Sequence, residues 1–145
     1  MEDLLRVSSL AASYNGKKVL SDLTFSLKPG EVLGVVGESG SGKSTILRAI
    51  LGILGSGGAV TGGEILFSGS NLLGLDEKRM REIRGAEIGM IFQDAGASLC
   101  PVRRVGSQMW ESMAAHGKTT KAQAKERALE LLENLGFSEA ERIWD

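Results

Sequence analysis

Hydrophobic and polar residues alternate in two runs near the N-terminus, at residues 4–14 and 19–27. A period of two residues is typical of a strand that buries one face. Asn15 and Gly16 stand between the two runs and form a hairpin turn signal, which two further polar residues lengthen. The pattern predicts two antiparallel strands, with a second turn at Pro29 and Gly30.

Continuous apolar runs replace this alternation further along the chain. Residues 31–36 hold such a run, which predicts a strand buried on both faces, as in a parallel sheet. Residues 88–92 predict another apolar strand, and residues 64–67 a short strand that ends at a Ser-Gly turn. The glycine-rich residues 55–63 predict a surface loop.

Helical spacing of apolar residues predicts the remaining elements. The clearest cases are residues 43–54 and 120–135, the second opened by a capping box of Thr120 and Gln123 and closed by Gly136. Asp76 is a candidate cap for a short helix at residues 76–84. Further helices are predicted at residues 105–115 and from residue 138 onward. The order of elements predicts an α/β fold with an N-terminal antiparallel β subdomain and C-terminal helices.

Composition narrows the class of protein. The chain has 145 residues, enough for one domain, and 42% of them are hydrophobic. Its formal net charge of -1 shows no basic excess, so a nucleic-acid partner is not expected. The longest apolar stretch, residues 46–54, is about half of what a bilayer span needs, and no secretory leader is visible. We expect a soluble, cytoplasmic chain whose membrane link, if any, comes through a partner.

Residues 37–44 carry the strongest chemical signal. They read Gly37, Glu38, Ser39, Gly40, Ser41, Gly42, Lys43 and Ser44, a complete G-x-x-x-x-G-K-[ST] motif between a predicted buried strand and a helix. The glycines let backbone N–H groups approach phosphate oxygens, and the helix N-terminus adds positive potential. Lys43 is predicted to reach the β- and γ-phosphates, Ser44 to ligate Mg²⁺, and Thr45 to donate a further hydrogen bond to phosphate. A glycine-rich turn with a surface lysine is the plainer alternative, but the full spacing and the apolar flanks favour a P-loop.

A P-loop alone does not distinguish kinases, GTPases, ATPases and motor proteins. The neighbouring motifs reduce the number of candidate protein classes. Residues 27–31 read LKPGE, residues 62–67 read GGEILF, and residues 89–94 read GMIFQD, followed by Ser98, Leu99 and Pro101. In this order the motifs resemble the ATP-binding subunit of ABC transporters, in particular importers of oligopeptides, dipeptides and nickel. The chain departs from that subgroup at Ala95, where a proline is usual, and at Cys100, where an asparagine is usual.

The resemblance implies roles for two further residues. Tyr14 would stack on adenine, and an aromatic face can pack on any base; the alternative is a hydrophobic strand residue. Gln93 would be the Q-loop residue, which ligates Mg²⁺ or holds the attacking water and responds to the membrane partner; the alternative is a polar residue that ends a strand. Together with Lys43, Gln93 is a candidate catalytic residue.

Two other functions remain open at the level of sequence. Residues 90–94 form an apolar run that ends in a carboxylate, so Asp94 could be the metal ligand of a small P-loop kinase. A free-standing, non-catalytic nucleotide-binding module is the other alternative.

The resemblance also sets expectations for the parent protein. It implies an N-terminal part of one ATP-binding domain over residues 1–145, with β strands at 1–30, the P-loop core to the Q-loop at 31–100, and the start of a helical subdomain at 101–145. The parent would be an ATPase that uses ATP and Mg²⁺, partners a second ATP-binding subunit and permease subunits, and lies at the inner face of the membrane. The P-loop core is expected to be incomplete without the signature motif and the Asp-Glu strand, so the chain alone is expected to be inactive and to self-associate. The transported solute cannot be read from this sequence.

Overall fold

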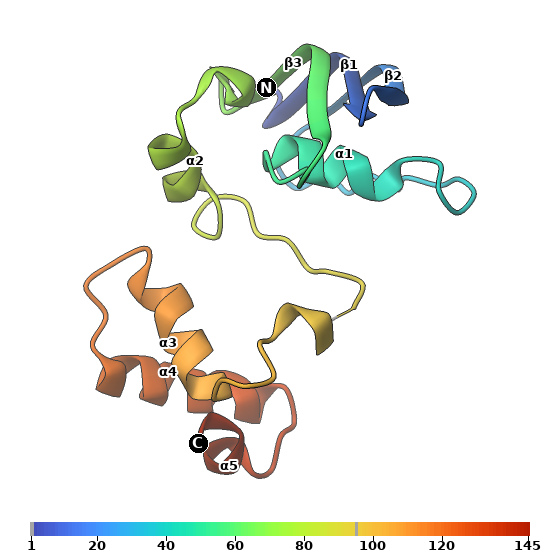
Figure 1. Ribbon diagram of the computed structural model, residues 1–145. Helices are drawn as coiled ribbons and strands as arrows, with labels where there is room; N and C mark the ends of the chain where they lie inside the picture. The colour runs from blue at the N-terminus through green and yellow to red at the C-terminus, as the bar shows by residue number, and fades with distance from the viewer. Residues whose placement is uncertain (1, 95) are drawn as a thin grey trace. The chain divides into compact units, whose positions relative to one another are not determined.

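A computed structural model describes residues 2–94 and 96–145, so Ala95, one of the two departures noted above, lies outside the described residues (Figure 1). The chain divides into two compact units, Met1–Arg81 and Glu82–Asp145.

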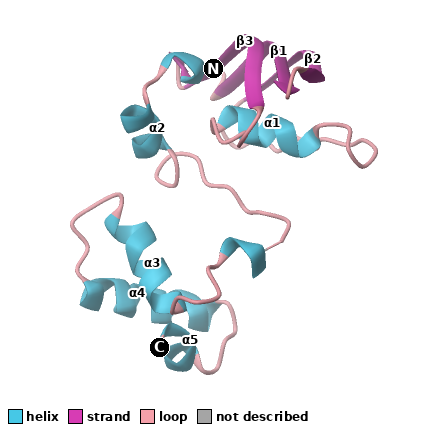
Figure 2. Ribbon diagram, in the orientation of Figure 1, coloured by secondary structure: helices cyan, strands magenta, loops and turns pink. Residues whose placement is uncertain are grey.

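A four-stranded antiparallel sheet forms the first unit. Its strands are β1 (Leu5–Tyr14), β2 (Lys17–Leu27), β3 (Gly58–Phe67) and β4 (Ser70–Asn71), in the spatial order β2-β1-β3-β4. Figure 2 labels the three long strands of this sheet. The predicted pair of N-terminal strands is therefore confirmed. β1 lies between β2 and β3, so its backbone is hydrogen-bonded along both edges.

The first hairpin turn is tighter than the sequence suggested. Asn15 and Gly16 both have positive φ, at 47° and 78°, and Tyr14 faces Lys17 directly across the turn. Positive φ at both central residues is the geometry of the two-residue hairpin turn that Asn-Gly favours. The two lysines that follow belong to β2 and do not lengthen the loop.

An irregularity in β1 changes which side chains are buried. Ser9 has a positive φ of 46°, and the register with both neighbouring strands shifts close to it. A bulge of this kind breaks the period of two. The fully buried residues of β1 are accordingly Val7, Leu10 and Ala12, and simple alternation fails after residue 8.

β3 is longer than predicted, because residues 58–63 belong to the strand and not to a surface loop. Gly63 explains the difference. Its φ is 92°, and a Cβ there would lie 2.6 Å from Leu10 Cα. Glycine in this position permits close approach of two backbones, a use that composition alone cannot distinguish from a loop.

The helix α1 (Lys43–Ile50) contacts β2 and β3 and buries Ile46, Ala49 and Ile50. It ends earlier than the predicted residue 54. Gly52 takes the left-handed conformation at φ 65°, and the N–H of Ile53 bonds the carbonyl of Arg48 at 2.8 Å. This Schellman arrangement terminates the helix, whatever the spacing of later apolar residues.

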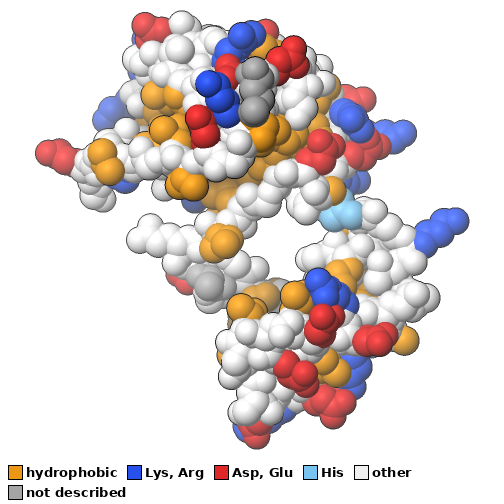
Figure 3. Space-filling view, turned by 180° about the vertical axis from the view of Figure 1, so that it is seen from behind, with side chains coloured by type: hydrophobic (Ala, Val, Ile, Leu, Met, Phe, Trp, Pro, Cys, Tyr) orange, Lys and Arg blue, Asp and Glu red, His pale blue; other side chains and the backbone are white. Residues whose placement is uncertain are grey.

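Two predicted core strands are absent from the described residues. Residues 31–36 and 88–92 form no strand, and only Ile88 makes an isolated bridge, to Arg84. Val32 is 98% exposed, Val36 94% and Ile91 96%; Figure 3 shows hydrophobic side chains lying open on the surface of both units. The prediction was wrong for a physical reason. A strand exists only through hydrogen bonds to a neighbour, and apolar composition does not supply that neighbour.

Helices make up the second unit, and α2 (Glu77–Ile83) spans the division between the two. The others are α3 (Val105–Ala114), α4 (Lys121–Asn134) and α5 (Ala140–Trp144), close to the predicted ranges. The caps are confirmed: Asp76 accepts the N–H of Arg79 at 2.8 Å, and Thr120 forms the capping box with Gln123. The core of this unit is built on Ala124, Ala128 and Trp144.

Candidate functional site

The loop that precedes α1 has the backbone that its glycines predict. Gly40 and Gly42 take φ values of 81° and 94°, in the left-handed region. Gly42 is the N-cap of α1, so the loop runs directly into the first turn of the helix. The first N–H groups of a helix have no intrahelical partner and can bind an anion.

The three motif glycines are required for different reasons. A Cβ at Gly42 would lie 2.8 Å from the Leu20 side chain, and one at Gly37 would lie 2.7 Å from Ser41 Oγ. Gly42 thus keeps the loop pressed on β2, and Gly37 keeps the loop compact. Gly40 has nothing within 4 Å of the equivalent position, so its side of the loop is open to a ligand.

Lys43 is the first residue of α1, and its side chain reaches back to this loop. Its ammonium group donates to the carbonyl of Gly37 at 2.8 Å, the carbonyl of Glu38 at 2.6 Å, and Ser41 Oγ at 3.4 Å. A lysine ammonium has three donors, so the loop uses all of them. The loop therefore concentrates one positive charge beside the N-terminus of α1, where an anionic ligand would be stabilised.

The other motif residues surround that charge. Glu38, Ser39 and Ser41 are exposed, Ser44 is exposed on the first turn of α1, and Thr45 is half-buried beside it. The first turn of α1 carries no acidic residue that would repel phosphate. Hydroxyls and backbone donors thus line the mouth of the loop.

Tyr14 is half-buried at the end of β1. Its hydroxyl donates to the carbonyl of Leu54 at 2.8 Å, in the segment that follows α1. These contacts fix the hydroxyl end of the ring and agree with a packing role in the strand. The adenine-stacking role stays a prediction.

Gln93 and Asp94 lie in the second unit, in an exposed stretch outside any helix or strand. The carbonyl of Asp94 accepts a hydrogen bond from Ser98 Oγ at 3.0 Å. The apolar strand that was expected to carry both residues is not formed there, and their catalytic or metal-binding roles stay predictions.

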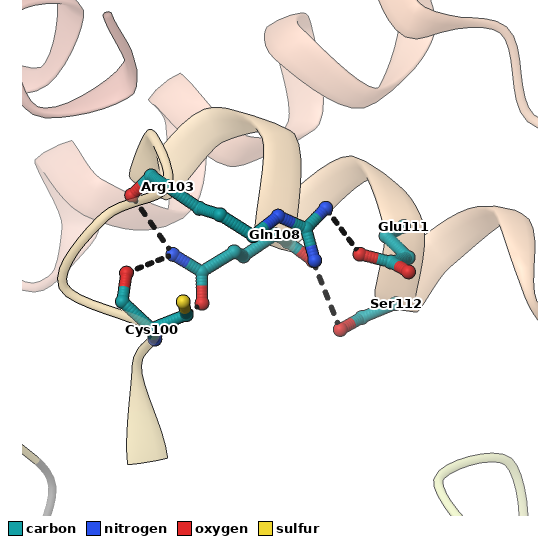
Figure 4. A network of polar contacts seen from close by, with 5 residues as sticks. All are labelled: Cys100, Arg103, Gln108, Glu111 and Ser112. Atoms are coloured by element: carbon teal, nitrogen blue, oxygen red, sulfur yellow. Dashed lines mark hydrogen bonds and ion pairs between the residues drawn. The ribbon is translucent and has the colours of Figure 1, made fainter. Parts of the chain in front are cut away.

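The hydrogen bonds around Gln108 were not predicted from the sequence. The Gln108 side chain accepts the N–H of Cys100 at 2.8 Å and donates to the carbonyls of Cys100 and Arg103, both at 3.1 Å (Figure 4). The Arg103 guanidinium pairs with Glu111 at 2.6 Å. The sequence gives no indication that the Gln108 amide will bond the backbone of Cys100, eight residues earlier. This amide holds the segment after Ser98 against the start of α3.

The described residues provide neither a membrane-spanning helix nor a metal-binding cluster. Within residues 2–94 and 96–145, no helix has the length and apolarity to cross a membrane. The same residues hold no cluster of three or more histidine, cysteine or acidic side chains suited to a metal ion.

Comparison with known proteins gives the family. The family described as "ABC transporter" matches residues 20–144. The chain is 46% identical to the oligopeptide transport ATP-binding protein OppD of Bacillus subtilis, over 96% of this chain and 40% of that protein. It is 41% identical to the dipeptide transport ATP-binding protein DppD of Lactococcus lactis, over 97% of this chain and 42% of that protein. The chain thus spans about two fifths of the length of these relatives.

Solved structures give the same result for the fold. The dimeric bacterial ABC transporter cassette MJ0796 superposes with a TM-score of 0.77 at 27% identity, over 93% of this chain and 58% of that one. The protein cbiO1 of Clostridium perfringens, part of an ABC transporter complex, gives 0.69 at 26% identity, over 97% and 53%. The incomplete α/β P-loop fold is therefore confirmed, and the family favours the transporter ATPase over the kinase alternative. The chain belongs to the ABC transporter family.

Proposed function

We propose that this chain binds Mg-ATP through the loop at residues 37–45, as the nucleotide-binding part of an ABC transporter that imports peptides or a similar solute. The observation that carries the proposal is the placement of Lys43. Its ammonium lies within a glycine loop at the N-terminus of α1, on carbonyls at 2.6 and 2.8 Å. Charge, backbone donors and an absence of side-chain bulk at Gly40 meet at one place.

A triphosphate fits this set of residues. Lys43 would exchange its carbonyl partners for β- and γ-phosphate oxygens, a stronger charge-assisted pairing. The first-turn N–H groups of α1 would bind the remaining phosphate oxygens, and Thr45 would add a hydroxyl donor. Tyr14 would contact the adenine.

A magnesium ion would be held by the Ser44 hydroxyl together with phosphate oxygens, because Mg²⁺ takes few protein ligands and relies on substrate oxygens. Bound there, it would neutralise charge on the phosphates. Gln93 is proposed as a further ligand or as the residue that orients the attacking water. With Lys43, it is the candidate catalytic residue for ATP hydrolysis in the parent protein.

The relatives support the proposed partners. OppD and DppD are named as transport ATP-binding proteins, and the cassette MJ0796 is described as dimeric. We infer that this chain acts with a second ATP-binding subunit and with permease subunits, which would place it at the inner face of the cell membrane. Peptides are favoured over nickel as the solute by the names of these relatives.

Lys43→Ala tests the nucleotide site. We expect affinity for ATP to fall about a hundredfold, since a charge-assisted contact to phosphate is worth about 3 kcal/mol. Calorimetric titration of a non-hydrolysable ATP analogue into both proteins measures it. Lys18→Ala, at an exposed position of β2, is the matched control and should keep wild-type affinity. Equal affinity of the Lys43→Ala and wild-type proteins would remove the assignment.

A further inference from the structure

Tyr14 and Gly58 face each other across two strands. They are register partners in the β1–β3 pair, at the end of the sheet where β1 turns into β2. In an antiparallel pair, the Cβ positions of two directly opposed residues lie about 5 Å apart. With no side chain on Gly58, the Tyr14 ring can cover the space above it.

The fit between the two residues is close. A Cβ at Gly58 would lie 2.8 Å from Tyr14 Cε1 and 2.7 Å from Leu54 Cβ, both too short for carbon atoms. Gly58 does not have a positive φ, unlike Gly57 beside it. Space for the tyrosine ring and for Leu54, and not backbone freedom, is therefore what requires glycine at position 58.

The same segment holds the tyrosine at two other points. The Tyr14 hydroxyl donates to the Leu54 carbonyl at 2.8 Å. The N–H of Asn15, the next residue, donates to the Gly57 carbonyl at 2.8 Å. Residues 54–58 thus contact the ring edge, the hydroxyl and the following backbone of Tyr14.

We propose that Gly58 is a positioning residue that sets the orientation of the Tyr14 ring for contact with the base of the nucleotide. This inference rests on the proposed function, which gives Tyr14 its ligand. The segment that holds the ring follows α1, and α1 begins at the phosphate-binding loop. One helix therefore links the predicted phosphate site at its start to the positioning of the tyrosine after its end.

A single tyrosine in the chain makes this testable, because 3-fluorotyrosine labels Tyr14 alone. The ¹⁹F resonance of the labelled 145-residue chain is recorded alone, with ATP and with tripolyphosphate, which has no base. In wild type, ATP should move the resonance more than tripolyphosphate does. In unliganded Gly58→Ala, the ¹⁹F resonance should already differ from that of unliganded wild type. The affinity of this variant for ATP should fall about tenfold, which is within the range of one base-stacking contact. Tripolyphosphate affinity should stay within about twofold, because the phosphate loop is untouched.

Gly62→Ala is the matched control. Gly62 lies in the same strand, and a Cβ there meets only Ala11 Cβ at an ordinary 3.8 Å. This variant should match wild type in resonance and in both affinities. Tyr14→Phe, unlabelled and followed by titration, keeps the ring, loses the bond to Leu54, and should lose less ATP affinity than Gly58→Ala.

The outcomes separate the inference from the function on which it rests. Gly58→Ala with the wild-type resonance and wild-type ATP affinity overturns the inference. So does an equal loss of ATP and tripolyphosphate affinity, which would indicate general damage to the unit. A wild-type protein that binds neither ligand contradicts the proposed nucleotide site itself.

Discussion

One glycine from each compact unit shows that this residue type has opposite uses. In the first unit, Gly40 leaves one side of the loop beside Lys43 open, with nothing within 4 Å of the position a Cβ would take. In the second, Gly106 is buried, and a Cβ there would meet the Trp144 carbonyl and lie 2.5 Å from its indole Cδ2. Gly40 thus leaves one side of a loop open, and Gly106 permits a close contact between two helices. The same residue type therefore indicates function only when its surroundings are known.

The units also differ in their spectroscopic residues. The only tyrosine lies in the first unit, and both tryptophans, Trp110 and Trp144, lie in the second. Tryptophan fluorescence therefore reports on the helical unit, and a labelled Tyr14 reports on the sheet. The unfolding of each unit can therefore be followed separately.

The largest effect is expected from Gly106→Val. The added isopropyl group would enter the contact between α3 and α5 at Trp144, and overpacking of a closed contact costs about 3 kcal/mol. Denaturant unfolding followed by tryptophan fluorescence should show this loss, while the Tyr14 resonance stays unchanged. Gly117→Val, with nothing within 4 Å, should leave both signals near wild type. Simultaneous loss of both signals in Gly106→Val would mean that the two units unfold as one.

A smaller effect, in the first unit, is expected from Gly42→Ala. The variant places a Cβ against Leu20 and forces a non-glycine residue into φ 94°, at a combined cost of about 2 kcal/mol. Gly40→Ala has the same backbone strain at φ 81° but no neighbour, so it should cost about half as much. Denaturant unfolding followed by the Tyr14 resonance measures the loss of stability in each of the two variants. Equal costs would show that contact with β2 does not hold the loop.

The smallest effect is expected from Thr120→Ala, which removes the capping box of α4 and should destabilise the second unit by about 1 kcal/mol. Tryptophan fluorescence in denaturant measures it. Thr120→Ser retains the hydroxyl and should recover most of the loss. A Thr120→Ala protein as stable as wild type would show that packing of Ala124 and Ala128 alone fixes the helix start.

Local chemistry explains why the helical unit was predicted well. The capping box at Thr120 and the stop at Gly136 act within a few residues of the chain, and both are present. The tight turn at Asn15 and Gly16 has the same local origin. Strands were predicted less well, because a strand is defined by a neighbour distant in sequence. The lengthening of β3 depends on Gly63 meeting β1, and the absence of a strand at residues 31–36 depends on the absence of a pairing partner among the described residues.

The sequence by itself determined the two N-terminal strands, the glycine motif that runs into α1, the start of that helix and both ends of α4. These follow from residue spacing, backbone preference and capping, which are local properties. Only the tertiary structure decided which apolar runs pair and where Lys43 places its charge. It also decided that Gly58 makes room for Tyr14. Those outcomes depend on contacts between segments far apart in the chain, and hydrophobicity favours burial without specifying the partner.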